Sequence, residues 1–213
     1  DDYALPEIEA FQERIRVAHD CGRPVAVHCV TRTELVYALS ALIEVGSLSG
    51  DRIEHASVVD DSTLDLMNRA GICVVTQPNF LVERGDQYLK DVDPQHFESL
   101  YRGKSFLDAG IPLGGGTDAP FGGADPWTAM RAAVHRKTAS GKVIGDQEKL
   151  TPEQALAMFT SSAETPGGPP RRVAPGQTAD LCLLARSWSE ARARISRDDV
   201  AMTVLAGTIT YRR

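Results

Sequence analysis

Four short apolar segments alternate with amphipathic helical patterns, and this alternation limits the possible fold more than any other feature of the chain. The segments are predicted strands, spanning residues 24–30, 52–58, 72–76 and 112–118. Val25-Ala26-Val27, in the first of them, is continuously apolar, as a strand covered on both faces is. Strands that alternate with helices require a parallel sheet with right-handed helical crossovers. We therefore predict an α/β fold.

Helices are predicted between and after these strands from helical spacing of apolar residues and from capping signals. They cover residues 6–21, 34–45, 61–70, 94–109, 126–137 and 151–163. The segment 79–92 is polar and charged around Glu83-Arg84-Gly85-Asp86, and we predict a long loop there. Loops of that length are usually functional or mobile.

The pattern changes in the last part of the chain. Residues 165–175 are rich in proline and glycine and read as a linker. Two β-like segments follow, 179–185 and 201–211, the second interrupted at Ala206-Gly207 as a hairpin would be. We expect a main domain over residues 1–170 and a small β appendage over 171–213.

Composition narrows the range of partners and compartments. The chain has 213 residues and a net charge of −6, which argues against nucleic acid or an anionic membrane surface as the main partner. No apolar run is long enough for a membrane span. The four cysteines lack CxxC spacing, and Cys29, Cys73 and Cys182 lie in apolar runs. Buried free thiols and a cytoplasmic location are expected.

Three of the predicted strands end on or near a side chain that can bind a metal: His28, His55 and Asp118. Side chains at the carboxyl ends of parallel strands project over one rim of the sheet, where α/β folds keep their sites. A single strand histidine is more often a hydrogen-bonded core residue, and a single aspartate after glycines is more often solvated. Three such residues at one rim favour a metal site instead, because two imidazoles and a carboxylate suit zinc with one position open for water.

The chemistry of such a site follows from its ligands. A bound divalent metal lowers the pKa of its water toward about 7, so a metal-activated hydroxide is available at neutral pH. A carboxylate beside it can take a proton during attack and return it to the leaving group.

Several motifs carry a resemblance to a known family. Val25-Ala26-Val27-His28, the run Arg52-Ile53-Glu54-His55-Ala56 and the run Gly116-Thr117-Asp118-Ala119-Pro120 resemble the strand-5, strand-6 and strand-8 motifs of the amidohydrolase superfamily. The similarity is to its amidohydrolase-3 branch, with deformylase-like and other amide-cleaving members. The tail around Pro175-Gly176-Gln177 resembles the return to that family's small β-sandwich domain. The resemblance implies strands 5–8 of a TIM (β/α)8 barrel followed by part of a β-sandwich.

The resemblance also implies roles for individual residues. His28, His55 and Asp118 would bind one or two divalent ions, with zinc expected, and Asp118 would be the general base and acid. Gln77, at the end of the strand-7 counterpart, would face a small-molecule substrate. The branch often follows its strand-5 histidine with Ala-Ile-Gly-Asp, whereas this chain has Cys29-Val30-Thr31-Arg32. That departure suggests that Thr31 or Arg32 reads a different substrate group.

Two family features are absent from this sequence. It contains no His-x-His pair of the kind that the family's first strand carries, and its four strand–helix units are too few to close a barrel, which takes about 250 residues. Half a barrel exposes strand edges and an apolar interior. We therefore expect an incomplete domain that forms a homo-oligomer or pairs with a missing N-terminal portion.

The sequence predicts a metal-dependent hydrolase that cleaves a C–N bond, in an amide or a related bond of a small molecule, with the 213-residue chain inactive by itself. Two alternatives stay open. One is a truncated, non-catalytic relative that serves as a binding or structural chain, which the absent His-x-His favours. The other is a doubly wound α/β enzyme that uses no metal.

Overall fold

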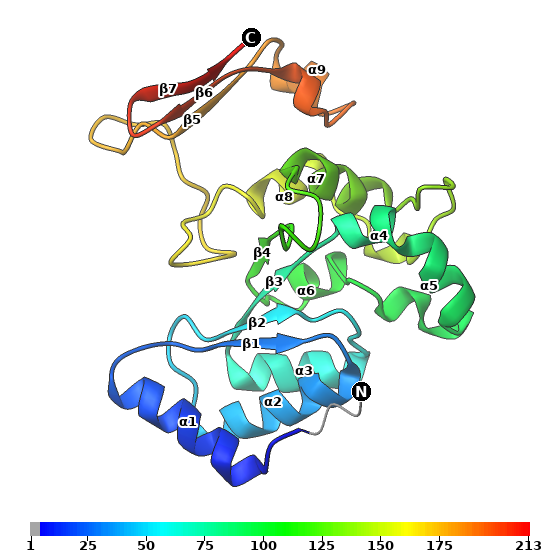
Figure 1. The fold of residues 1–213 in the computed structure, drawn as a ribbon, viewed down its shortest axis with the longest axis vertical. Helices are drawn as coiled ribbons and strands as arrows, with labels where there is room; N and C mark the ends of the chain where they lie inside the picture. Colours follow the sequence, from blue (N-terminus) through cyan, green and yellow to red (C-terminus); the bar gives the residue numbers. More distant parts are fainter. Residues whose placement is uncertain (1–4) are drawn as a thin grey trace.

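Four parallel strands form the central sheet of the N-terminal part of the chain (Figure 1). The structure, a computed structural model, describes residues 5–213. The strands lie in chain order: β1 (Ala26–Cys29), β2 (Arg52–His55), β3 (Cys73–Thr76) and β4 (Leu113–Gly115). All three pairings are parallel, so the carboxyl ends of the strands lie at one edge. The predicted α/β fold with a parallel sheet is confirmed.

Three helices pack on one side of this sheet, as Figure 1 shows. They are α1 (Ile8–Asp20), α2 (Arg32–Val45) and α3 (Asp61–Ala70). Local signals set their ends: the Asp60 side chain accepts a hydrogen bond from the Thr63 amide, and Gly71 ends α3 with a left-handed φ of 64°. Leu39 of α2 and Ile53 of β2 are fully buried in the resulting core.

The opposite face of the sheet is mixed, because Cys73 and Val75 share it with charged residues, so the expectation of an apolar interior holds only in part. Ile53, Val74 and Leu113 are buried in the core on the helix side. Because side chains alternate along a strand, the other face takes Arg52 and Glu54, which form an ion pair of 2.6 Å. The outer edge of β1 has no strand partner among residues 5–213. Pairing of that edge with further chain or with another copy stays a prediction.

The segment predicted as a loop over 79–92 is helical, and the helix predicted over 94–109 is broken. The observed elements are α4 (Asn79–Glu83), α5 (Gly85–Asp91), a 3-10 turn (Pro94–Ser99) and α6 (Lys104–Asp108). A second apolar cluster explains the first difference, since Phe80 and Leu81 pack with Leu100 there. The second has a backbone cause: the Tyr101 amide bonds the Ser57 carbonyl at 2.9 Å, which pulls the chain out of helical geometry.

Two further helices complete the main body. The predicted helix over 126–137 appears as α7 (Pro126–His135), and that over 151–163 ends early, as α8 (Pro152–Ala157). Both begin as their sequences indicate, because the Asp125 side chain caps α7 and Thr151 forms a capping box with Gln154. A 3-10 turn, Asp146–Glu148, lies between them.

The C-terminal part forms a separate antiparallel sheet of three strands, at the top of Figure 1. Its elements are β5 (Leu181–Leu184), α9 (Trp188–Ala191), a 3-10 turn (Arg197–Asp199), β6 (Val200–Leu205) and β7 (Thr208–Arg212). The hairpin turn falls at Ala206-Gly207, both with positive φ, as tight hairpins favour. A second sheet, which a sandwich requires, stays a prediction, as does the domain boundary near residue 171.

Two smaller expectations can be checked on the part of the chain that the structure describes. No helix within residues 5–213 combines the length and the apolar character that crossing a bilayer requires. Cys29 and Cys73 are buried free thiols, whereas Cys182 is exposed on the C-terminal sheet, so the expected burial is wrong for that residue.

Candidate metal centre

His28 and His55 lie side by side at the carboxyl edge of the parallel sheet. The register of β1 and β2 pairs His28 with Glu54 and Cys29 with His55, which offsets the two histidines by one position. Their ring centroids are 4.5 Å apart and the rings meet edge to face. His28 is exposed and His55 is buried. The two imidazole rings can therefore contact a ligand in the same small region.

Asp118 joins the histidines at one pocket. The residue lies in the loop after β4 rather than at the end of the strand, since β4 stops at Gly115. A pocket of about 280 Å³ is lined by His28, His55 and Asp118 together. The Asn79 side-chain amide donates to the Thr117 carbonyl at 3.1 Å, which fixes the backbone immediately before Asp118.

Backbone strain gathers at this pocket. His55 has a φ of 71°, Asp118 of 57° and Tyr101 of 44°, and all three line the pocket. A left-handed conformation is unfavourable for residues that carry a Cβ, and it persists only when the surrounding structure imposes it. Such residues cluster at functional sites, so this edge of the sheet is marked by its conformation as well as by its side chains.

Unpaired polar atoms gather in the same place. The side-chain oxygens of Ser57, Thr76, Gln77 and Asn79 are buried and have no hydrogen-bond partner within residues 5–213. All four residues lie at or just beyond the carboxyl ends of β2 and β3. Buried polar atoms are nearly always paired in folded proteins, so a group of exceptions points to a ligand, ion or water as the missing partner.

The environment of His55 favours its neutral form. Burial lowers the pKa of the His55 imidazole below its usual value, and the adjacent His28 lowers it further. Asp118 and the neighbouring Gln77 act in the opposite direction on the same pKa. A metal binds imidazole only in the neutral form, so the net direction suits a ligand.

The donor atoms at this pocket suit a divalent metal, but the side chains do not form a complete coordination site. Within residues 5–213 no three His, Cys, Asp or Glu side chains are close enough to hold an ion as they stand. The donor set at the pocket, two imidazoles and a carboxylate beside unpaired buried oxygens, is nevertheless the set that zinc takes in open sites.

Comparison with known proteins assigns the chain to a family. The Amidohydrolase family matches residues 2–211. The chain belongs to this family.

The relatives show what kind of amidohydrolase the chain resembles. N-substituted formamide deformylase from Arthrobacter pascens is 27% identical over 221 residues, which cover 99% of this chain and 40% of the deformylase. A metal-dependent hydrolase from Pyrococcus horikoshii is 30% identical, with a TM-score of 0.66 over 73% of this chain and 32% of that structure. A mutant of atrazine chlorohydrolase TrzN from Arthrobacter aurescens, solved with zinc and atraton, is 18% identical and shares the fold, with a TM-score of 0.65 over 98% of this chain and 48% of that structure.

The chain thus spans about two fifths of the deformylase and less than half of either structure. These neighbours agree with an α/β domain of which the chain supplies part of the sheet.

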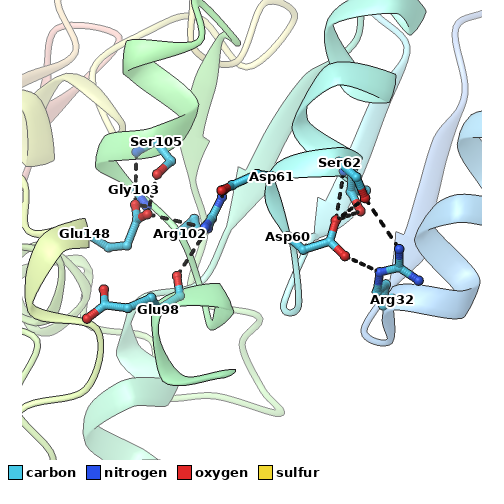
Figure 2. Close-up of polar contacts among 10 residues, drawn as sticks. Arg32, Asp60, Asp61, Ser62, Glu98, Arg102, Gly103, Ser105 and Glu148 are labelled. Carbon is cyan, nitrogen blue, oxygen red and sulfur yellow. Dashed lines mark hydrogen bonds and ion pairs between the residues drawn. The ribbon is translucent and has the colours of Figure 1, made fainter. Parts of the chain in front are cut away.

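The three residues expected to contact substrate, Gln77, Thr31 and Arg32, lie in different surroundings in the structure. Gln77 lies next to His55 at the end of β3, 3% exposed, with its Oε1 unpaired. Thr31 caps α2 through a capping box with Glu34. Arg32 forms an ion pair with Asp60 and reaches toward the start of α3, as Figure 2 shows. Thr31 and Arg32 do not line the pocket, so their substrate roles stay predictions that this geometry does not support.

Sequence reasoning missed the other wall of this amidohydrolase pocket. That wall is lined by Phe80, Arg84, Tyr88, Tyr101 and Phe121. Its residues come from α4, α5, the residue between these helices and two later loops, so no short motif joins them. The one available signal was the long charged segment 79–92, whose length marked it as functional while its helices went unrecognised.

Proposed function

We propose that this chain carries the metal-binding and proton-transferring residues of a hydrolase that cleaves a C–N bond in an amide or related small molecule. The observation that carries the proposal is the meeting of His28, His55 and Asp118 at one pocket, two of them in strained backbone conformations. The similarity to a formamide deformylase supports the bond type.

His28, His55 and Asp118 are the side chains that would hold one or two divalent ions. Zinc is favoured because imidazole and carboxylate ligands suit it and because the TrzN structure was solved with zinc. When bound, the metal supplies Lewis-acid activation of water at neutral pH. Burial lowers the pKa of His55, which favours the neutral imidazole that a metal binds.

Asp118 would move the proton. Its carboxylate accepts a proton from the attacking water while the water oxygen bonds to the acyl carbon. The C–N bond then breaks, and Asp118 returns the proton to the departing nitrogen, giving an acid and an amine. The left-handed backbone at Asp118 and the bond that Asn79 makes to Thr117 hold the carboxylate in the pocket.

Gln77 would contribute orientation. Its unpaired Oε1 lies beside His55 and can accept a hydrogen bond from the ring, from water or from a substrate group. The pocket volume of about 280 Å³ suits a small molecule rather than a polymer.

A non-catalytic binding chain is the second candidate. It is favoured by one observation, that no three metal-capable side chains within residues 5–213 are already close enough to hold an ion. Such a chain would keep the amidohydrolase fold and its pocket without hydrolytic activity.

The test uses the full-length protein, purified and analysed for bound metal, with hydrolysis measured on a panel of amides and N-acyl compounds. Hydrolysis that is lost on chelation and returns with zinc supports the proposal. Asp118→Asn should lower turnover by about 10²–10⁴-fold, while His135→Asn, at an exposed position on α7, is the matched control. Protein that neither binds added zinc nor hydrolyses any member of the panel would favour the binding chain.

A further inference from the structure

The pocket that contains His28, His55 and Asp118 has a second, cationic wall. Arg84 stands there, between the short helices α4 and α5, and lines the pocket together with the three metal-capable residues. Its guanidinium carbon lies 4.0 Å from the ring centroid of Phe121 and 5.0 Å from that of Phe80. Two aromatic faces therefore hold the cation by cation–π contacts and limit its freedom.

Two tyrosine hydroxyls lie on the same wall. Tyr88 and Tyr101 stack with ring centroids 6.0 Å apart, and their hydroxyls are 3.1 Å apart. Burial raises the pKa of the Tyr88 hydroxyl, and the hydrogen bond with Tyr101 raises it further. The Tyr88 hydroxyl therefore keeps its proton at neutral pH. One of the two hydroxyls donates to the other, which leaves the second hydroxyl's proton for a ligand.

Arg84 forms no ion pair with any carboxylate of residues 5–213. Within residues 5–213 its guanidinium makes no hydrogen bond or ion pair, and the adjacent Glu83 carboxylate is already taken by the Asn79 amide at 3.1 Å and the Gly123 amide at 3.0 Å. Arg136 shows the contrast, because its buried guanidinium donates to three backbone carbonyls, those of Leu100, Tyr101 and Ile144. The chain thus pairs each nitrogen of the buried Arg136 with a backbone carbonyl and leaves the half-buried Arg84 open toward the pocket.

We infer that Arg84, supported by the Tyr88–Tyr101 hydroxyl pair, binds a carboxylate of the substrate, so that the substrate class is an amide that also carries a carboxylate, as N-acyl amino acids do. This inference rests on the proposed amide hydrolysis. A planar guanidinium matches a carboxylate with two parallel N–H···O bonds, and a hydroxyl adds a third donor. The acyl group would then face His28, His55 and Asp118 across a pocket of about 280 Å³.

The kinetic test compares pairs of N-acyl compounds that differ only in a carboxylate, for example an N-acyl amino acid and the N-acyl amine of the same side chain. In the full-length protein the acid should have the higher kcat/KM. Arg84→Gln should lower kcat/KM for the acid about 10- to 100-fold and leave the amine unchanged, since hydrogen bonds to charged groups have that worth. Arg84→Lys, which keeps the charge without the fork, should fall between them. Arg69→Gln removes an exposed arginine of α3 as the matched control.

Binding separates this inference from the proposed function. The N-acyl amino acid is titrated into wild type, Arg84→Gln and Arg69→Gln by calorimetry, after circular dichroism has shown that each is folded. Acid binding that Arg84→Gln weakens at least tenfold supports the inference even if no amide is hydrolysed, in which case only the proposed function fails. Amide hydrolysis with equal rates on acid and amine, and no effect of Arg84→Gln on either, overturns the inference and leaves the proposed function standing. Should Arg84→Gln not fold, Tyr88→Phe takes its place, with a smaller loss expected for the acid alone.

Discussion

Buried polar side chains are treated in opposite ways in two regions of this molecule. Glu148 is buried, and both of its carboxylate oxygens accept hydrogen bonds (Figure 2). The Glu148 carboxylate accepts from the Gly103 amide at 3.1 Å, from the Ser105 amide at 2.9 Å and from the Ser105 hydroxyl. Arg102 lies 3.5 Å from it and also pairs with Asp61 at 2.7 Å. We call this set the Glu148 network.

At the carboxyl edge of the parallel sheet, by contrast, several buried polar atoms have no hydrogen-bond partner within residues 5–213. Oxygens of Ser57, Thr76, Gln77 and Asn79 are buried there without partners, and His55 and Asp118 hold left-handed backbones. An unpaired buried polar atom costs about 1–3 kcal/mol, and a strained residue about the same. Because the chain pairs the buried polar atoms of the Glu148 network, the unpaired atoms at the edge of the sheet do not reflect a general inability of this fold to pair such groups. The comparison teaches that the edge is organised for a ligand and the network for stability.

Removing the carboxylate of Asp118 should give the largest effect. Asp118→Asn keeps the side-chain shape but cannot accept a proton, so kcat for amide hydrolysis should fall by about 10²–10⁴ in the full-length protein. The melting temperature should hardly change, because none of the ion pairs within residues 5–213 includes Asp118. Asp108→Asn, in an exposed ion pair with Lys104, is the control for charge. A wild-type rate in Asp118→Asn would remove this residue from the chemistry.

Breaking the Glu148 network should act on stability instead. Glu148→Ala leaves the Gly103 and Ser105 amides without their acceptor and removes one of the two carboxylates beside Arg102, which keeps Asp61. The free energy of unfolding should fall by about 1–3 kcal/mol for each unsatisfied amide. Denaturant unfolding measures it, with the exposed Asp146→Ala as control. Folded Glu148→Ala should still bind zinc like wild type. A loss below about 1 kcal/mol would contradict the structural role assigned to the network.

His55→Asn should weaken zinc binding while leaving the fold intact. Loss of a ligand or of its support reduces metal affinity about 10- to 100-fold. His96→Asn and His135→Asn change exposed histidines far along the chain and should leave zinc affinity unchanged. Competition against a chromophoric chelator gives the affinities. If His96→Asn proved as harmful as His55→Asn, the metal site would have to lie elsewhere.

The strand ends illustrate how much of this edge could be read from the sequence. Short apolar runs ending at His28 and His55 gave strands that differ from the observed ones only at their ends, and parallel pairing brought the two rings together. Asp118 was placed at a strand end, but β4 stops at Gly115 and the residue reaches the pocket from a loop. Periodicity locates a strand well and its final residue poorly, because the end depends on where the partner strand stops pairing.

The cationic wall could not be predicted from local patterns. Phe80 and Tyr88 become helical because they pack on Leu100, Tyr101 and Ile144, which lie later in the chain. A polar segment with a central glycine reads as a loop until those distant apolar partners are known. For the same reason Arg84 drew no attention, since its aromatic clamp includes Phe121 from the loop after Asp118.

The smallest effect is expected at Asn79. Its side-chain amide donates two hydrogen bonds, to the Glu83 carboxylate and to the Thr117 carbonyl, so it is paired like the groups of the Glu148 network. Its Oδ1 is buried without a partner, like the other oxygens at the edge of the sheet. The amide of Asn79 holds the Thr117 carbonyl next to Asp118. Asn79→Ala should therefore lower kcat about 2- to 10-fold, which corresponds to the loss of one hydrogen bond. Zinc affinity should stay unchanged, because the substitution removes no metal ligand. Asn68→Ala, at an exposed position of α3, is the matched control. The measurement is kcat at saturating substrate together with zinc affinity for each variant. A lower kcat with unchanged zinc affinity fits a residue that positions Asp118. A fall in zinc affinity of the same size would place Asn79 in the support of the metal, and an unchanged kcat would show that the Thr117 loop keeps its place without this bond.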